Sequence, residues 1–269
     1  MSAAYGKYLA IARAAFWQRL SERAALIGRI SFYCLILLVF SCVWRSIFSA
    51  QNPLDADGEA AAHAAGDYVW YLALTEWIML SQPSLYLDIE SDVRSGDIAY
   101  QLARPLSYVG GKLAEGVGDL LLRMLTLAPF GLLFARLFSG QWADGRGLAL
   151  AALVGVAAAL VLLLCHAAIG LCAFWLHDCL PVYLVWQKLL FVLGGLMLPL
   201  SIYPEWLQAL AQRLPFASML YGPGQLVSHP DAGRALELSV ELGAWLVLAA
   251  LLVLGLERRG RRALELAGG

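Results

Sequence analysis

The sequence predicts an all-α integral membrane protein whose 269 residues form one transmembrane domain. Hydrophobic residues make up 61% of the chain and charged residues only 14%, whereas about 25% of the residues in an ordinary soluble domain are charged. The mean hydropathy is +0.69. Apolar segments of about 20 residues recur along the chain, and this is the length that a helix needs to cross the bilayer. These observations exclude an ordinary soluble protein.

Six segments are long and apolar enough to be predicted as transmembrane helices. Four of them are almost free of charge, and the second contains a single internal carboxylate, Glu76. The third carries Glu115, Asp119 and Arg123 at intervals of four residues, so these side chains share one helical stripe and can pair with each other. The predicted spans are residues 31–48, 68–87, 113–138, 148–175, 182–200 and 242–256.

The distribution of positive charge predicts the orientation of these spans. Most of the 19 Lys and Arg residues lie before the first span, between spans two and three, or after the last span. Positive residues in short flanks stay on the cytoplasmic side, so both termini and the connection between spans two and three are predicted to be cytoplasmic. We therefore expect a multi-pass protein of a bacterial-type plasma membrane.

Two further segments flank the spans. Residues 1–28 are predicted to form an amphipathic interfacial helix with Tyr5, Leu9, Ala12, Phe16 and Leu20 on one face, although a cytoplasmic helix packed on other protein is the alternative. Residues 201–235 are divided by prolines and predict a re-entrant helical hairpin on the outer side, between spans five and six. The hairpin residues singled out are Pro199, Pro204, Glu205, Trp206, Pro215 and Pro223.

The connection at residues 88–110 concentrates charge in an otherwise apolar chain. Carboxylates and arginines alternate there with aliphatic side chains, Gly96 divides the segment, and Pro105 forces Arg104 away from helical geometry. Exposed charge with apolar anchors is typical of a docking surface, and a solvated turn without a partner is the alternative. The residues of interest are Asp88, Glu90, Asp92, Val93, Arg94, Gly96, Asp97, Ile98, Leu102, Arg104, Pro105 and Leu106.

The order of these parts resembles the permease subunits of ABC-2 type transporters. The stretches DVRSGDIAYQLARPLS, at 92–107, and LPLSIYPEWLQALAQRLPFASMLYGP, at 198–223, are similar to the six-span branch associated with drug or viologen-type export. The resemblance implies that residues 88–110 hold a coupling helix, which docks on an ABC ATPase subunit present in two copies. It also implies a second permease, identical or a sister chain, and outward transport by alternating access, with ATP and Mg²⁺ bound by the ATPase.

Ionisable groups inside membrane spans are the usual candidates for a transport path. Glu76 lies beside Trp77 in the second predicted span, and a carboxylate next to an aromatic ring suits a cationic amphiphile. His166 lies in the fourth span. The alternative for both ionisable residues is a structural hydrogen bond to a neighbouring helix. We expect Asp119 and Arg123 to form an internal ion pair rather than a cargo site.

Other classes of protein fit the sequence less well. The chain contains no G-x-x-x-x-G-K-[ST] phosphate loop, so energy must come from a partner, and neither a metal site nor a nucleic-acid partner is expected. A membrane-embedded transferase would need a catalytic cluster, and a secondary transporter would show interrupted helices in both halves. Export of a lipid or glycan is the main alternative to export of a hydrophobic or cationic drug-like molecule.

Overall fold

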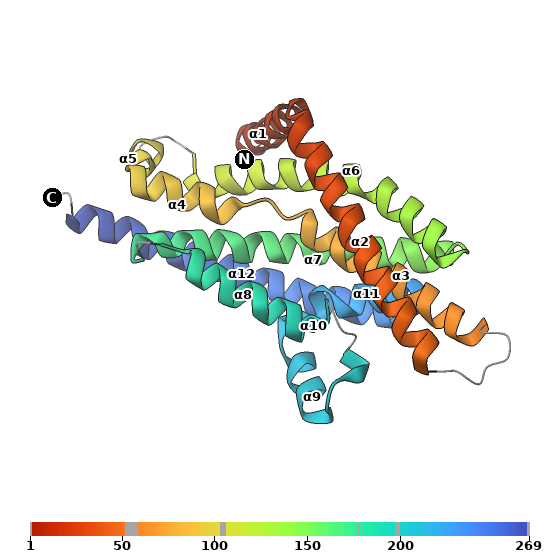
Figure 1. The fold of residues 1–269 in the computed structure, drawn as a ribbon. Helices are drawn as coiled ribbons and strands as arrows, with labels where there is room; N and C mark the ends of the chain where they lie inside the picture. The colour runs from red at the N-terminus through yellow and green to blue at the C-terminus, as the bar shows by residue number, and fades with distance from the viewer. Residues whose placement is uncertain (1, 52–58, 103–105, 177, 197–199, 268–269) are drawn as a thin grey trace.

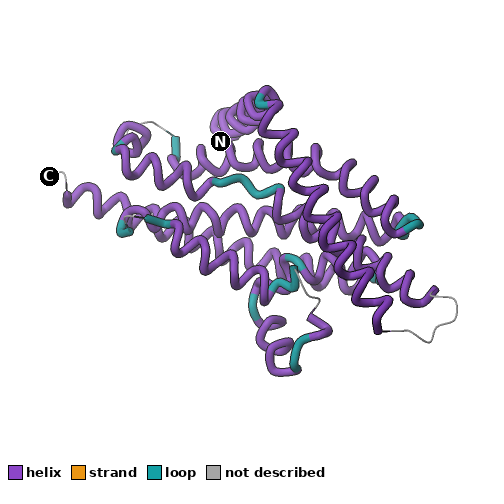
Figure 2. The backbone as a smooth tube through the Cα atoms, viewed as in Figure 1, coloured by secondary structure: helices purple, strands orange, loops and turns teal. Residues whose placement is uncertain are grey.

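The computed structural model describes residues 2–51, 59–102, 106–176, 178–196 and 200–267, and this part of the chain is built of helices and short connections without strands (Figure 2). The helices are α1 (Ser2–Ser21), α2 (Arg23–Gln51), α3 (Glu59–Leu80), α4 (Leu85–Ser95), α5 (Asp97–Leu102), α6 (Tyr108–Ser139), α7 (Gly145–Leu171), α8 (Leu180–Leu193), α9 (Glu205–Arg213), α10 (Pro215–Met219), α11 (Tyr221–Ser228) and α12 (Ala232–Ala267), with 3-10 turns η1 (Cys172–Phe174) and η2 (Leu200–Ile202).

The long helices form one bundle with α7 at its centre (Figure 1). α7 packs against α12, α4, α11, α3 and α6. Its buried face carries small residues such as Ala151, Gly155 and Ala158, which let neighbouring helices approach closely. A Cβ atom at Gly155 would lie 3.2 Å from Ile78 and 3.3 Å from Trp77, both in α3. Close helix contact through small residues, rather than interlocking charges, therefore organises the centre of the bundle.

Four helices in the described residues are long and apolar enough to cross a membrane, namely α2, α6, α7 with η1, and α12. α3 and α8 are not among them. The fifth predicted span, 182–200, is wrong as one continuous helix, because α8 ends at Leu193 and Gly195 adopts a φ of +72°. Its 14 residues rise only about 21 Å, short of the roughly 30 Å hydrocarbon core. A topology of six spans stays a prediction.

The second predicted span also ends early. The sequence predicts helix to residue 87, but α3 ends at Leu80 and α4 begins at Leu85, so Pro83 lies in a break (Figure 2). Proline lacks an amide hydrogen and disfavours helical geometry in the residue before it. The carbonyl groups released by the break find partners: Arg123 donates to the Gln82 oxygen at 2.6 Å, and His166 Nδ1 lies 3.4 Å from the Pro83 oxygen. The break is therefore supported by α6 and α7.

The predicted interfacial segment 1–28 divides after Ser21, because α1 ends there and α2 already begins at Arg23. α1 packs along α6, and at Gly118 of α6 the backbone of Ala12 comes into direct contact. The predicted apolar face is only partly covered by this contact, since Leu9 remains 72% exposed. Whether α1 lies on a membrane surface stays a prediction.

The proline-rich region before α12 forms η2 and three short helices, with α9 projecting from the bundle (Figure 1). Pro204 caps the start of α9, as predicted from its position, and Glu205 is the first helical residue. Pro215 begins α10, and the buried Pro223 lies in α11, which packs on α7 and α3. Trp206 is 69% exposed on α9. Pro199 lies outside the described residues, and a re-entrant path through the membrane stays a prediction.

Candidate functional site

Asp92 is the centre of the charged corner formed by α4 and α5. Its Oδ2 atom accepts hydrogen bonds from the Tyr108 hydroxyl at 2.9 Å and from Gln101 Nε2 at 3.1 Å. The Lys112 ammonium group lies 2.8 Å from the same oxygen. Because Gln101 belongs to α5 and the other two donors belong to α6, one carboxylate joins α4, α5 and α6. Charge-assisted bonds of this kind are roughly twice as strong as neutral ones.

Glu90 makes a second connection from α4, toward α8. Its carboxylate is buried, with Oε2 accepting from the backbone amide of Cys179 at 3.3 Å and Oε1 accepting from Arg94 at 3.0 Å. Cys179 directly precedes α8. The rings of Tyr86 in α4 and Tyr183 in α8 stack with centroids 4.2 Å apart. α4 is thus fixed to α8 by a polar contact and an aromatic contact.

The predicted docking residues divide into buried and exposed groups. Ile98 is 1% exposed, so it holds α5 to the protein's own core, and its predicted role as an exposed anchor is wrong. Val93 and Leu106 are partly buried, whereas Arg94 and Asp97 are exposed. Gly96 separates the two helices at a φ of +80°, a left-handed conformation that favours glycine. α5 ends at Leu102, whose side chain is not described. Arg104 and Pro105 lie outside the described residues.

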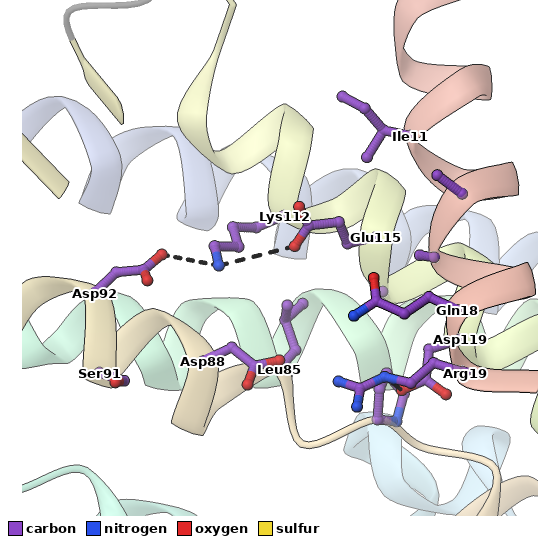
Figure 3. A pocket seen from close by; sticks show the side chains of 14 residues that line it. Ile11, Gln18, Arg19, Leu85, Asp88, Ser91, Asp92, Lys112, Glu115 and Asp119 are labelled. Atoms are coloured by element: carbon purple, nitrogen blue, oxygen red, sulfur yellow. Dashed lines mark ion pairs between the residues drawn. The ribbon is translucent and has the colours of Figure 1, made fainter. Parts of the chain in front are cut away.

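A polar pocket of about 550 Å³ lies between α1, α4 and α6, next to this corner (Figure 3). Asp88 and Asp92 face it from α4, and Lys112 and Glu115 face it from α6, with Lys112 3.8 Å from Glu115. Partial burial raises the pKa of the Asp88 carboxyl above its ordinary range, and the charges of Lys112 and Arg19 oppose that shift. The pocket therefore brings Arg19 of α1 close enough to Asp88 of α4 for their charges to interact.

The ion pair predicted between Asp119 and Arg123 is present in α6. Arg123 Nε and Nη2 each donate to one oxygen of the carboxylate at 2.6 Å, and both side chains are buried. Arg19 of α1 lies 3.6 Å from the same carboxylate. Since Arg123 also donates to the Gln82 oxygen in the α3–α4 break, this bidentate pair connects α1, α6 and the break.

Glu76 and His166, two of the three predicted path residues, line one cavity of about 460 Å³, which we call the inner cavity. It is lined by α2, the end of α3, the α3–α4 break and α8, and by single residues of α4, α6 and α7. The third residue, Trp77, faces away. Its indole nitrogen donates to the Met124 oxygen at 2.8 Å, and it lines a separate apolar pocket of about 300 Å³. The predicted pairing of Glu76 with the Trp77 ring is therefore wrong.

Comparison with known families decides the class of the protein. The family model described as ABC-2 type transporter matches residues 7–222, which is most of the chain and takes in most of α1, the helices α2 to α10 and the start of α11. The chain belongs to the ABC-2 type transporter family. None of the curated proteins matches it in sequence. An ABC-2 membrane domain is a permease component, which implies an ABC transporter with an ATPase partner.

The sequence does not predict several of the residues that complete the site of this ABC-2 protein. Tyr108 lies in the predicted docking segment and Lys112 just before the third predicted span, but the sequence does not signal that both hold Asp92. Gln82 and Cys179 contribute backbone groups to Arg123 and Glu90, and no side-chain pattern signals such contacts. Pro83 is the exception, because a proline predicts a helix break, and the Gln82 carbonyl that Arg123 binds lies in that break. Among the described residues, no group of three His, Cys, Asp or Glu side chains could hold a metal ion.

Replacing Arg123 with Ala is expected to lower the stability of this permease by about 3–5 kcal/mol, because Asp119 would remain buried without its bidentate partner and with Arg19 no closer than 3.6 Å. Thermal unfolding of the purified protein in nanodiscs measures the effect. The double variant with Asp119→Ala should recover part of the loss, since no buried charge is then left unpaired. Arg234→Ala, which opens the exposed pair with Glu237, should change little. Equal stability of Arg123→Ala and Arg234→Ala would contradict the proposed role of the buried pair.

Proposed function

We propose that the chain is the transmembrane permease subunit of an ATP-driven ABC exporter, which moves a hydrophobic or cationic drug-like molecule outward by alternating access. Two copies of a separate ATPase subunit bind ATP and Mg²⁺. A second permease, identical or a sister chain, completes the membrane part. The protein lies in a bacterial plasma membrane with six spans and with both termini in the cytoplasm, α3 and α8 completing their crossings with the residues that follow them.

The observation that carries this proposal is the double attachment of α4. Asp92 joins it to α5 and α6, and the neighbouring carboxylate of Glu90 joins it to the start of α8. A helix held in this way cannot shift without moving the two membrane helices bound to it. This is what a coupling element requires, because a push from an ATPase must reach the transport path.

The exposed part of the same corner supplies a surface for the ATPase. Leu87 and Tyr100 are large apolar side chains that are 46% and 78% exposed, and Arg94 and Asp97 are exposed charges on the same two helices. Aromatic anchors surrounded by charge are typical of specific interfaces. In this arrangement Tyr100 supplies contact area, and the charges set the register of the two proteins. Ile98 serves the interface indirectly by fixing α5 in place.

The arrangement of the ends supports the proposed orientation. α4, α5 and the C-terminal end of α12 lie at the same end of the bundle (Figure 1). That end of α12 carries Arg258, Arg259, Arg261 and Arg262. A cluster of Arg after a membrane helix favours the cytoplasmic side, where it also meets anionic lipid headgroups. α9 projects from the side of the bundle (Figure 1), so the proposed outer location of the proline-rich region rests on the distribution of Lys and Arg.

Purification of the complex from its native membrane tests the proposal. We expect mass spectrometry to find a Walker-type ATPase and two permease chains, and we expect proteoliposomes containing that complex to accumulate a lipophilic cationic dye only when ATP and Mg²⁺ are supplied on the ATPase side. Vesicles with an ATPase variant that binds but does not hydrolyse ATP serve as the control. Transport by the isolated chain on an ion gradient would contradict the proposal and favour a secondary transporter.

A further inference from the structure

The inner cavity contains a buried carboxylate that nothing in the described structure compensates. Glu76 is 6% exposed and lines the cavity from α3. Among the described residues it takes part in no hydrogen bond or ion pair. An isolated ionised carboxylate is very unfavourable in an apolar environment, and buried charges in proteins are normally paired. The position therefore suits a guest that brings a positive charge.

The other charged groups around the cavity and the His166 ring are already engaged or partly in contact with solvent, and the side-chain oxygen of Gln82 is a neutral acceptor that is buried without a hydrogen-bond partner among the described residues. Arg123 is bound by Asp119 and by the Gln82 oxygen, and the His166 ring is in contact with the Pro83 oxygen. Arg29 is only partly buried and lies in the second turn of α2. Glu76 is thus the deeply buried charge in this cavity that remains available to a ligand.

The remaining walls are suited to an apolar body. Phe32, Ile36 and Phe40 line the cavity from α2, and Phe191 and Leu196 line it from α8 and the residues after it. Aromatic rings stabilise organic cations through their π faces in addition to excluding water. A volume of about 460 Å³ lies within the range of small-molecule sites, roughly 300–1,000 Å³.

We propose that the inner cavity binds a monovalent lipophilic cation, with Glu76 as its counter-charge and the rings of α2 and α8 around its apolar body. The inference rests on the proposed transport function, since it identifies the cargo site of that permease. It also connects cargo to coupling. Tyr86 of α4 and Tyr183 of α8 both line the cavity and stack on each other, so a displacement of α4 changes the cavity wall directly.

Two probes of matched shape and opposite charge test this assignment. The full chain in nanodiscs of zwitterionic lipid is titrated with tetraphenylphosphonium and with tetraphenylborate by calorimetry, and titrations of empty nanodiscs are subtracted. We expect saturable binding of the phosphonium cation. Glu76→Gln should weaken it at least about tenfold, because a charge-assisted contact is lost, and Glu76→Asp should retain most of it. The borate anion should bind Glu76→Gln at least as well as it binds the wild type.

Glu237→Gln is the matched control, because it removes a carboxylate that is exposed on α12 and pairs only with Arg234 among the described residues. It should leave the binding of both probes unchanged. A second measurement uses only the wild-type protein and so does not depend on the folding of any variant. Bound tetraphenylphosphonium should protect Glu76 from modification by dicyclohexylcarbodiimide. Mass spectrometry of the labelled peptide measures this protection.

Three results would overturn the inference: no saturable binding of the cation, equal affinity in the wild type and Glu76→Gln, or no protection of Glu76. Tighter binding of the borate anion that depends on Arg29 would instead assign the cavity to anionic amphiphiles. None of these outcomes would contradict the proposed ATPase partner. If the complex described above failed to form an ATP-driven transporter while the cation still bound at Glu76, the proposed function would fail and the site would stand.

Discussion

Replacing Asp92 with Lys is expected to abolish ATP-driven transport while leaving the protein inserted in the membrane. The substitution places an ammonium group against Lys112, removes the acceptor of Tyr108 and Gln101, and so detaches α4 from α5 and α6. Each charge-assisted bond contributes about 1.5–3 kcal/mol, so losing three of them should reduce the transport rate by at least about 100-fold. Dye accumulation in proteoliposomes with the ATPase measures the loss, and the amount of protein in the membrane fraction reports insertion.

Two further variants separate coupling from folding. Asp92→Asn keeps an oxygen that can accept from Tyr108 but loses the charge opposite Lys112, so it should transport at an intermediate rate. The charge-exchanged double variant, Asp92→Lys with Lys112→Asp, restores an opposite pair across α4 and α6 and should recover part of the activity. ATPase binding should persist in Asp92→Asn, because α5 and its exposed Tyr100 then stay attached to α4. Wild-type transport by Asp92→Lys would disprove the role of this carboxylate in coupling.

Hydropathy predicted the long apolar helices, because each of them is defined by one continuous segment of the sequence. α2 and α7 are long runs of apolar residues, and composition and length alone predict that they are long and apolar enough to cross a membrane. The ends of α3 and α8 could not be predicted from hydropathy. Gly194 and Gly195 end α8, and Pro83 lies between α3 and α4, within segments whose average hydropathy stays high. A window average hides a single residue that cannot continue a helix.

The candidate site was predictable where its partners are near in sequence. The Asp119–Arg123 pair spans one helical turn, and its spacing alone predicts it. The contacts that give Asp92 and Glu90 their importance join residues 20 and 89 positions apart, and the second of them uses a backbone amide. The same limit explains the error at Ile98, because an aliphatic side chain in a charged segment looks like an anchor for a partner until the fold shows that it is buried.

Replacing Gly118 with Ala is expected to separate α1 from α6. A Cβ atom at this position would overlap the carbonyl oxygen of Ala12 and come within 2.9 Å of its carbon. The obstacle is backbone rather than a flexible side chain, so α1 has to move as a unit. Overpacking of this kind costs about 1–3 kcal/mol. We expect a lower thermal unfolding midpoint in nanodiscs and much faster trypsin cleavage within α1, at Arg13 and Arg19.

Gly111→Ala is the matched control, since it lies in the same helix and an added Cβ would meet no atom within 4 Å. Alanine favours helix over glycine, so this variant should be slightly more stable than the wild type. Cleavage of α1 at the same rate in both variants would show that the Gly118 contact does not hold the helix. If α1 is released only by Gly118→Ala, Arg19 leaves the neighbourhood of Asp119, and the polar pocket beside Asp88 loses one of its three walls. Transport by that variant should then fall even though α4, α5 and their exposed surface are unaltered.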